Sequence, residues 1–202
     1  MKIQQVRFPQ ILKATMVSVP ILLGSQNLKS QDKALDRDVF EKSKTELTEV
    51  ADSMLESPAI KVGNDTIYPA IVIDLSENKL YQYDTECFLE NVYPVASGKK
   101  STPTTPGLRI ITGKEEYPYK NAPKVTKRAK NPNDYGTNLF TLAEVDTITG
   151  KVLPSDGRFL HGTFNPKSIG KYVSKGCIRL NNENIQKLTE IIDKGQYVLI
   201  KE

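Results

Sequence analysis

Residues 161–179 open with His161-Gly162-Thr163 and close with Ser174-Lys175-Gly176-Cys177-Ile178-Arg179. This stretch holds the only histidine of the chain and one of its two cysteines. A thiol needs a nearby base or cation to ionise at neutral pH, so any thiol chemistry here has His161 as its imidazole partner. The glycines that follow the histidine and precede the cysteine let backbone approach a substrate closely. The structural alternative is a small buried thiol and an ordinary core histidine.

The stretch resembles the catalytic signature of L,D-transpeptidases, the YkuD-type domain. That signature is His-Gly-Thr/Ser, a spacer, and then Ser/Thr-His-Gly-Cys followed by a hydrophobic residue and Asn or Arg. His161 matches the first histidine, and the second half is matched at Ser174, Gly176, Cys177, Ile178 and Arg179. Lys175 stands where many members carry a second histidine, and a subset of the family with Ser-Lys-Gly-Cys-Ile-Arg shares this feature.

The resemblance covers about Thr66 to Glu202. Residues 71–75 and 79–83 are similar to the hairpin that opens the family domain, and Gly98 to Gly107 is similar to its Thr-Pro-Thr-Pro-Gly loop. Pro103 and Pro106 are expected to make that loop a rigid turn.

The hydrophobic pattern from Thr66 onward predicts a mainly β fold, an antiparallel β-sandwich or barrel with one packed helix. Asn181 or Asn182 can cap that helix, Ile185, Leu188 and Ile192 form one face, and Gly195 is expected at its C′ position. His161 would end one strand and Cys177 would begin another. The predicted strands are 70–75, 79–83, 92–96, 108–112, 139–145, 158–161 and 197–200.

Upstream of the domain we expect two further segments. Residues 1–25 combine a basic start with a short apolar stretch, which is typical of a signal peptide or a short membrane anchor. Residues 26–65 are expected to form a helical stalk or linker, since 31–56 has apolar residues at helical spacing. Residues 66–202 are the predicted catalytic domain, and a chain that begins near Ala59 is expected to fold.

The formal net charge is +4, and Lys2, Arg7 and Lys13 contribute to it with no acidic residue before Asp32. The excess therefore belongs to the leader, and we predict no nucleic-acid partner. Cys87 is interpreted as a bystander, because a disulfide with Cys177 would consume the nucleophile. One histidine and two cysteines are too few for a structural zinc set, so neither a metal nor another cofactor is expected.

The resemblance implies acyl transfer with Cys177 as nucleophile and His161 as the acid–base group that, as imidazolium, protonates the leaving amine. The carbonyl of Gly162 would hold the other ring nitrogen. The backbone N–H groups of Gly176 and Cys177 are candidate oxyanion donors.

Arg179 follows Cys177 by two positions, so on a strand both side chains point to one face. It is interpreted as the grip for a substrate carboxylate, and an ion pair with a local acid is the alternative. Ser174 either binds near the site or shapes the turn. Lys175 is expected to favour the thiolate electrostatically.

The implied donor is a peptidoglycan stem tetrapeptide that loses its terminal D-alanine, and the implied acceptor is the side-chain amine of another stem. The product would be a 3→3 cross-link. An L,D-carboxypeptidase of the same fold and a non-catalytic cell-wall-binding module remain as alternatives. The predicted location is the periplasm, the cell wall or the outer face of the cytoplasmic membrane, with membrane attachment through the N-terminus as an option.

Overall fold

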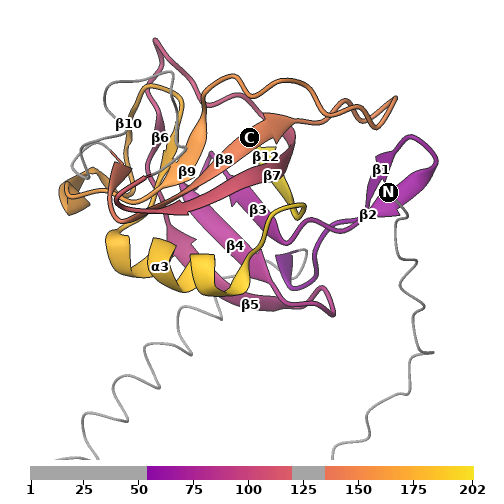
Figure 1. Ribbon diagram of the computed structural model, residues 1–202, viewed down its shortest axis with the longest axis horizontal. Helices are drawn as coiled ribbons and strands as arrows, with labels where there is room; N and C mark the ends of the chain where they lie inside the picture. The colour runs from indigo at the N-terminus through magenta and orange to yellow at the C-terminus, as the bar shows by residue number, and fades with distance from the viewer. Residues whose placement is uncertain (1–53, 120–134) are drawn as a thin grey trace, which may run out of the picture. The chain divides into compact units, whose positions relative to one another are not determined.

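The computed structural model describes residues 54–119 and 135–202, and these residues carry one large sheet with a helix beside it (Figure 1). The predicted leader and most of the predicted stalk helix lie outside the described residues. The sheet has the strand order β11-β9-β8-β7-β12-β3-β4-β5. Its strands are β3 (Ile71–Asp74), β4 (Lys79–Tyr83), β5 (Leu89–Pro94), β7 (Gly107–Glu116), β8 (Asn138–Glu144), β9 (Phe159–His161), β11 (Ile178–Arg179) and β12 (Tyr197–Lys201).

The mainly β fold with a packed helix is confirmed, but the sheet is mixed rather than wholly antiparallel. β12 pairs in parallel with β3 and antiparallel with β7. β11 also runs parallel to its neighbour β9. Both parallel pairs need a long connection between their strands, because a tight turn joins only antiparallel neighbours. Local sequence patterns identify each strand but not the partner that it finds across such a connection.

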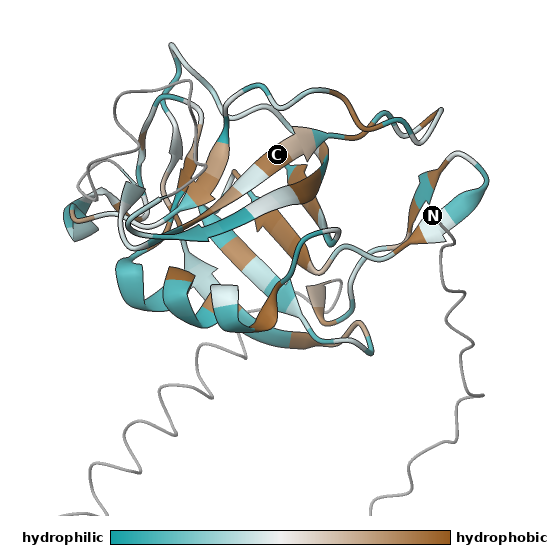
Figure 2. Ribbon diagram, in the orientation of Figure 1, coloured by the Kyte–Doolittle hydropathy of each residue, from teal (hydrophilic) through white to brown (hydrophobic). Residues whose placement is uncertain are grey.

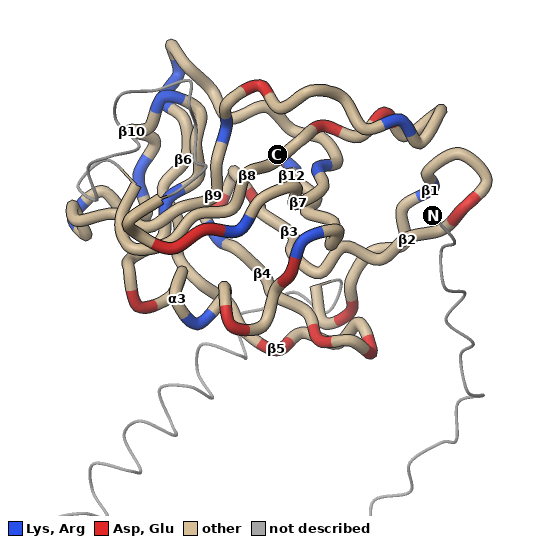
Figure 3. Tube along the Cα trace, viewed as in Figure 1, with Lys and Arg blue, Asp and Glu red and all other residues tan. Residues whose placement is uncertain are grey.

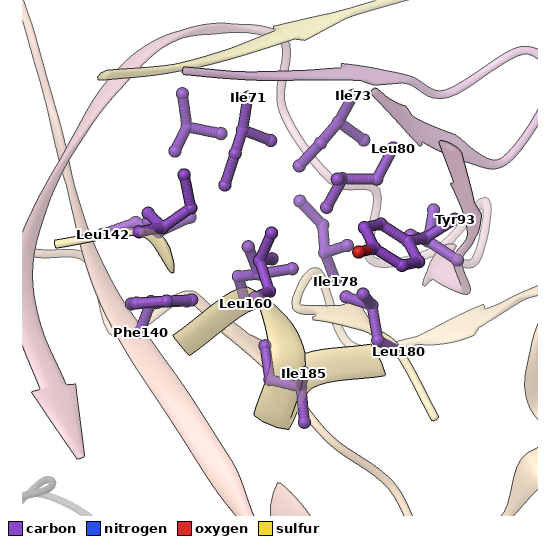
Figure 4. Close-up of a cluster of buried hydrophobic side chains, with 14 of the residues drawn as sticks. Ile71, Ile73, Leu80, Tyr93, Phe140, Leu142, Leu160, Ile178, Leu180 and Ile185 are labelled. Atoms are coloured by element: carbon purple, nitrogen blue, oxygen red, sulfur yellow. The ribbon is translucent and has the colours of Figure 1, made fainter. Parts of the chain in front are cut away.

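The main core lies between one face of the sheet and α3 (Asn182–Ile191). Figure 4 shows Ile185 of the helix pointing toward Leu160 in a cluster that also contains Phe140 and Ile178. In Figure 2 the apolar residues concentrate on the sheet strands, while α3 exposes hydrophilic residues. Burial of such apolar surface is the principal stabilising contribution to the fold.

The predicted cap of α3 is confirmed at its N-terminus and wrong at its C-terminus. The side chain of Asn181 accepts a hydrogen bond from the backbone N–H of Asn184 at 2.9 Å, and Glu183 lies in the first turn. The helix ends with Ile192 as its C-cap, so Gly195 is not at C′. Gly195 instead lies in the turn before β12, where its φ of +91° requires glycine.

Residues 54–67 are part of the folded domain, which differs from the expected stalk. β1 (Ile60–Val62) and β2 (Asp65–Ile67) form an antiparallel hairpin, so this part of 26–65 is not helical. Met54 is 8% exposed and packs with Val72, Tyr81 and Tyr83 on the sheet face opposite the α3 core. The hydroxyl of Tyr83 also donates to the carbonyl of Met54 at 3.1 Å.

These contacts make residues 54–58 a requirement for full stability. We expect Met54→Ala to lower the free energy of unfolding by about 2–3 kcal/mol, because it removes a buried side chain and leaves a cavity. Leu55→Ala is the matched control, since Leu55 is 44% exposed. Chemical denaturation of both variants measures the difference. Equal stabilities would show that the domain needs nothing before Ala59, as the sequence alone suggests.

Candidate active site

The pairing of β9 with β11 brings the two halves of the motif together. Ile178 is in register with Leu160, and Arg179 with His161. Ile178 and Leu160 both point into the core that α3 covers. Because side chains alternate along a strand, Cys177, Arg179 and His161 point to the other face. A histidine that ends one strand and a cysteine that precedes the next therefore lie diagonally across one pair of strands, as predicted.

His161 is buried and held in one orientation. Its Nδ1 lies 2.6 Å from the carbonyl oxygen of Gly162, and the Tyr135 ring meets the imidazole edge-on with 5.0 Å between centroids. A carbonyl oxygen only accepts, so the neutral ring carries its proton on Nδ1 and Nε2 is the basic nitrogen. The predicted role of the Gly162 carbonyl matches this contact.

Gly162 is also required by packing. A Cβ on this residue would overlap the side-chain oxygen of Asn182, at the start of α3. Asn182 accepts a hydrogen bond from the backbone N–H of Thr137 at 3.3 Å, so the oxygen is held in place. The glycine therefore lets the strand that carries the histidine approach the helix closely.

Cys177 lies half-buried in an apolar cluster with Tyr119, Tyr135, Leu139 and Phe159. Burial raises the pKa of its thiol above the usual value. A hydrogen bond from the Phe159 backbone and the charges of Arg179 and Arg158 oppose this rise in pKa, and the charge of Asp156 adds to it. Both Cys177 and Cys87 are free thiols, so no disulfide consumes the candidate nucleophile.

Burial favours the neutral form of both His161 and Cys177 in the resting site. Burial, with a smaller contribution from the charge of Arg179, lowers the pKa of His161 to about 4, although hydrogen bonds to the Gly162 and Tyr135 backbones act to raise it. At neutral pH the site therefore holds a thiol and a neutral imidazole. Such a histidine can accept the thiol proton as a base, and it becomes an acid only after that transfer.

Residues 174–177 form the nucleophile loop, and the side chain of Ser174 holds this loop together by hydrogen bonds to its backbone. Ser174 is fully buried, and its hydroxyl donates to the carbonyl of Cys177 at 2.5 Å and accepts from the N–H of Gly176 at 3.0 Å. The N–H of Gly176, which was predicted as an oxyanion donor, is therefore hydrogen-bonded within the loop. In the part of the chain that the structure describes, the Cys177 N–H has no acceptor. Ser174 thus shapes the turn and is not placed as a substrate contact.

The guanidinium of Arg179 has no acidic partner among residues 54–119 and 135–202, although its Nε is buried. Only its backbone is engaged, by exchanging hydrogen bonds of 2.9 Å with Ala96. The ion pair that was the alternative interpretation of Arg179 is therefore not found in this region. A half-buried guanidinium with an unbonded Nε, beside a thiol and an imidazole, is suited to bind a carboxylate.

The 98–107 loop packs against the nucleophile loop and forms hydrogen bonds with its backbone, a structural role that the sequence did not indicate. The hydroxyl of Thr104 donates to the carbonyl of Gly176 at 3.0 Å, and that of Thr102 donates to the carbonyl of Ser174 at 3.1 Å. β6 (Ser97–Gly98) pairs in parallel with β10 (Tyr172–Ser174) beside these contacts. The threonines of the loop would have suggested this function only if the pairing of β6 with β10 had been known.

The comparisons with known proteins agree with this geometry. The family model described as the L,D-transpeptidase catalytic domain, YkuD, matches residues 68–200. Over 151 residues the chain is 30% identical to YqjB of Bacillus subtilis, which is named for this family, and the match covers 73% of this chain and 80% of the relative. It is 29% identical to ErfK/SrfK of Escherichia coli, also named for this family, across 73% of this chain and 49% of that protein.

Among solved structures, Bd1075 of Bdellovibrio bacteriovorus matches with a TM-score of 0.49 and 20% identity over 73% of this chain and 53% of that one. An L,D-transpeptidase from Mycobacterium tuberculosis matches with a TM-score of 0.46 and 21% identity over 67% and 59%. The family model alone spans well over half of the residues. The chain therefore belongs to the YkuD-type L,D-transpeptidase catalytic domain family.

Proposed function

We propose that this protein is an L,D-transpeptidase that uses Cys177 to transfer the acyl group of one peptidoglycan stem peptide to the amine of another, forming 3→3 cross-links. The observation that carries the proposal is the placement of a free thiol, a base and an unpaired guanidinium on one face of β9 and β11. In acyl transfer the thiol acts as the nucleophile, the imidazole as the acid–base group, and the guanidinium as the group that binds the substrate carboxylate.

In the first half-reaction, Nε2 of His161 takes the thiol proton of Cys177 while the sulfur attacks the carbonyl before the terminal D-alanine. The tetrahedral oxyanion accepts a hydrogen bond from the Cys177 N–H, a contact worth about 3 kcal/mol in other acyl-transfer enzymes. The imidazolium then gives its proton to the nitrogen of the leaving D-alanine. The C–N bond breaks and a thioester on Cys177 remains.

In the second half-reaction, the neutral His161 removes a proton from the incoming side-chain amine as that amine attacks the thioester. The tetrahedral intermediate collapses, the C–S bond breaks, and the imidazolium returns the proton to sulfur. The cycle ends with the thiol and imidazole in their starting states, so no cofactor enters the balance. Water in place of the amine would make the same site an L,D-carboxypeptidase.

Arg179 is the proposed anchor for a carboxylate of the donor stem. A guanidinium forms paired hydrogen bonds with a carboxylate, and such a pair fixes the orientation as well as the position of the ligand. Figure 3 shows Lys and Arg around β6 and β10, whereas Asp and Glu gather around β5. The cationic side of the domain is therefore the side on which β10 leads into the Cys177 loop.

We also propose that the protein is exported, because the stem peptides that it would act on lie outside the cytoplasmic membrane. The basic start and short apolar stretch of residues 1–25 support a signal peptide or anchor. Within the described ranges, no helix has the length and apolarity needed to cross a membrane. Fractionation of cells that express the full chain tests export, and recovery in the cytoplasm alone would contradict it.

The direct test of function is incubation of the protein with a stem tetrapeptide, alone and with a second stem that offers a free side-chain amine. We expect mass spectrometry to find D-alanine release, a thioester on Cys177 and a cross-linked dimer. Arg179→Gln should keep the thiol but lower kcat/KM for this donor. Release of D-alanine without a cross-linked dimer would identify an L,D-carboxypeptidase. If neither D-alanine nor a thioester on Cys177 is found, the non-catalytic wall-binding module would be the remaining alternative.

A further inference from the structure

Arg158 lies beside the nucleophile loop although it belongs to neither half of the family motif. It immediately precedes Phe159, whose backbone forms a hydrogen bond with the Cys177 thiol. A Cβ on Gly176 would come within 3.2 Å of Nε of Arg158. Gly176 has a φ of +107°, and this conformation brings the loop backbone against the guanidinium.

The position of the Arg158 side chain is fixed by two neighbours. Nη1 is 2.9 Å from a carboxylate oxygen of Asp156 and also donates to the hydroxyl of Thr105. The other oxygen of Asp156 accepts a hydrogen bond from the backbone N–H of Arg158 at 3.1 Å, so this carboxylate orients both the backbone and the side chain of Arg158. Nε and Nη2 have no acceptor within the described ranges. The guanidinium is therefore held with free donors beside the loop that carries the thiol.

We propose that Arg158 is a second cation of the active site, which with Arg179 stabilises the thiolate that Cys177 becomes during attack. The proposal rests on the assignment of Cys177 as nucleophile, but not on the identity of the substrate. Arg158 acts as a positioning residue, because it adjoins the backbone on either side of the reacting atom and does not itself bond the substrate.

A cation beside Cys177 would offset the effect of burial, which disfavours the thiolate. Cys177 is half-buried, and burial raises the pKa of its thiol. The neutral His161 supplies no positive charge before proton transfer. The thiolate must then be stabilised by fixed charges, and Arg179 and Arg158 both lower the thiol pKa while Asp156 raises it. Six titratable or charged side chains face this region. They are His161 and Arg179 on β9 and β11, Arg158 and Asp156 in the loop before β9, and Tyr119 and Tyr135 in the apolar cluster that contacts Cys177.

Lys175 was expected to provide this stabilisation, and Arg158 is the better candidate from its position and surroundings. Lys175 is only two positions from Cys177, but its side chain is exposed, and it is not among the main charges that act on the thiol. Proximity in sequence is a poor guide here, because neighbouring side chains in a turn diverge. An exposed charge is also screened by water and salt.

The test is the pH dependence of Cys177 alkylation by iodoacetamide, in a Cys87→Ser background so that Cys177 is the only thiol. Arg158→Gln should raise the apparent pKa and lower the alkylation rate at pH 7 by about three- to tenfold, since one pKa unit is a factor of ten in thiolate. Arg158→Lys, which keeps the charge, should recover most of the rate. Lys175→Gln removes a charge that lies closer to Cys177 in the sequence, and it should leave the profile unchanged.

Circular dichroism and thermal unfolding should be matched across the set, and Arg158→Met replaces the glutamine variant if that variant does not fold. Superimposable profiles for Arg158→Gln and the parent would overturn the proposal. An equal shift in Lys175→Gln would also overturn it, because the effect would then be one of net charge. Alkylation needs no stem peptide. The effect of Arg158 on the Cys177 thiol could therefore be interpreted even if the protein had no transpeptidase activity.

Discussion

Cys177→Ala is expected to abolish turnover of stem peptides and to leave the fold unchanged. The thiol is the only nucleophile among the groups that β9 and β11 bring to one face, and alanine removes the atom that would form the thioester. Loss of activity should reach the detection limit. Because Cys177 lies at the edge of its cluster and is only partly buried, replacing the sulfur with hydrogen should cost little stability.

Cys87→Ser is the matched control for this experiment. Cys87 lies in the turn between β4 and β5, with a φ of +70°, and its thiol pKa is raised by burial and by the charges of Asp84 and Glu56. No described cation lowers its pKa, so it lacks what a nucleophile needs. Stem-peptide turnover and intact mass should therefore match the parent protein. Equal loss of activity in both folded variants would show that the two cysteines share a function and would refute the assignment of Cys177.

His161→Ala should lower the rate of acylation by about 10²–10⁴-fold, the usual contribution of a positioned acid–base group. His161 is the only histidine in the sequence, so no second imidazole can replace it. Single-turnover formation of the Cys177 thioester, followed by mass spectrometry, measures the rate directly. Unchanged acylation would remove His161 from the mechanism.

The same histidine predicts where activity and stability fall in acid. Protonation of the folded protein at His161 occurs near pH 4, so the acid limb of kcat/KM should lie near pH 4 and not near the ordinary histidine value. The unfolded chain binds this proton near pH 6.5, so between about pH 6.5 and pH 4 the unfolded state holds more protons. The contribution of His161 to stability is therefore complete above pH 6.5 and declines as the pH falls toward 4. His161→Gln should flatten that part of the stability profile.

Much of the local structure could be predicted from the sequence. A continuous apolar run predicted a strand at 70–75 and alternation predicted one at 79–83, and the structure has strands at 71–74 and 79–83. Asn181, one of the two predicted caps, begins α3, because a side chain and the backbone within four residues determine such a feature. The His161 and Cys177 segments resembled one family so closely that the fold followed from them. The contact between His161 and the Gly162 carbonyl was implied by the same resemblance.

What the tertiary structure alone decided depends on contacts between distant residues. The parallel pairing of β12 with β3 and the packing of Met54 on Tyr83 join segments that no local pattern connects. The same is true of Thr104 beneath Gly176 and of Arg158 beside it. The charges that act on Cys177 follow from this packing. The sequence could therefore name the candidate nucleophile, while the neutral resting forms of Cys177 and His161 and the proposed second cation required the structure. Burial and the distances between charges set a pKa, and both are properties of the folded chain.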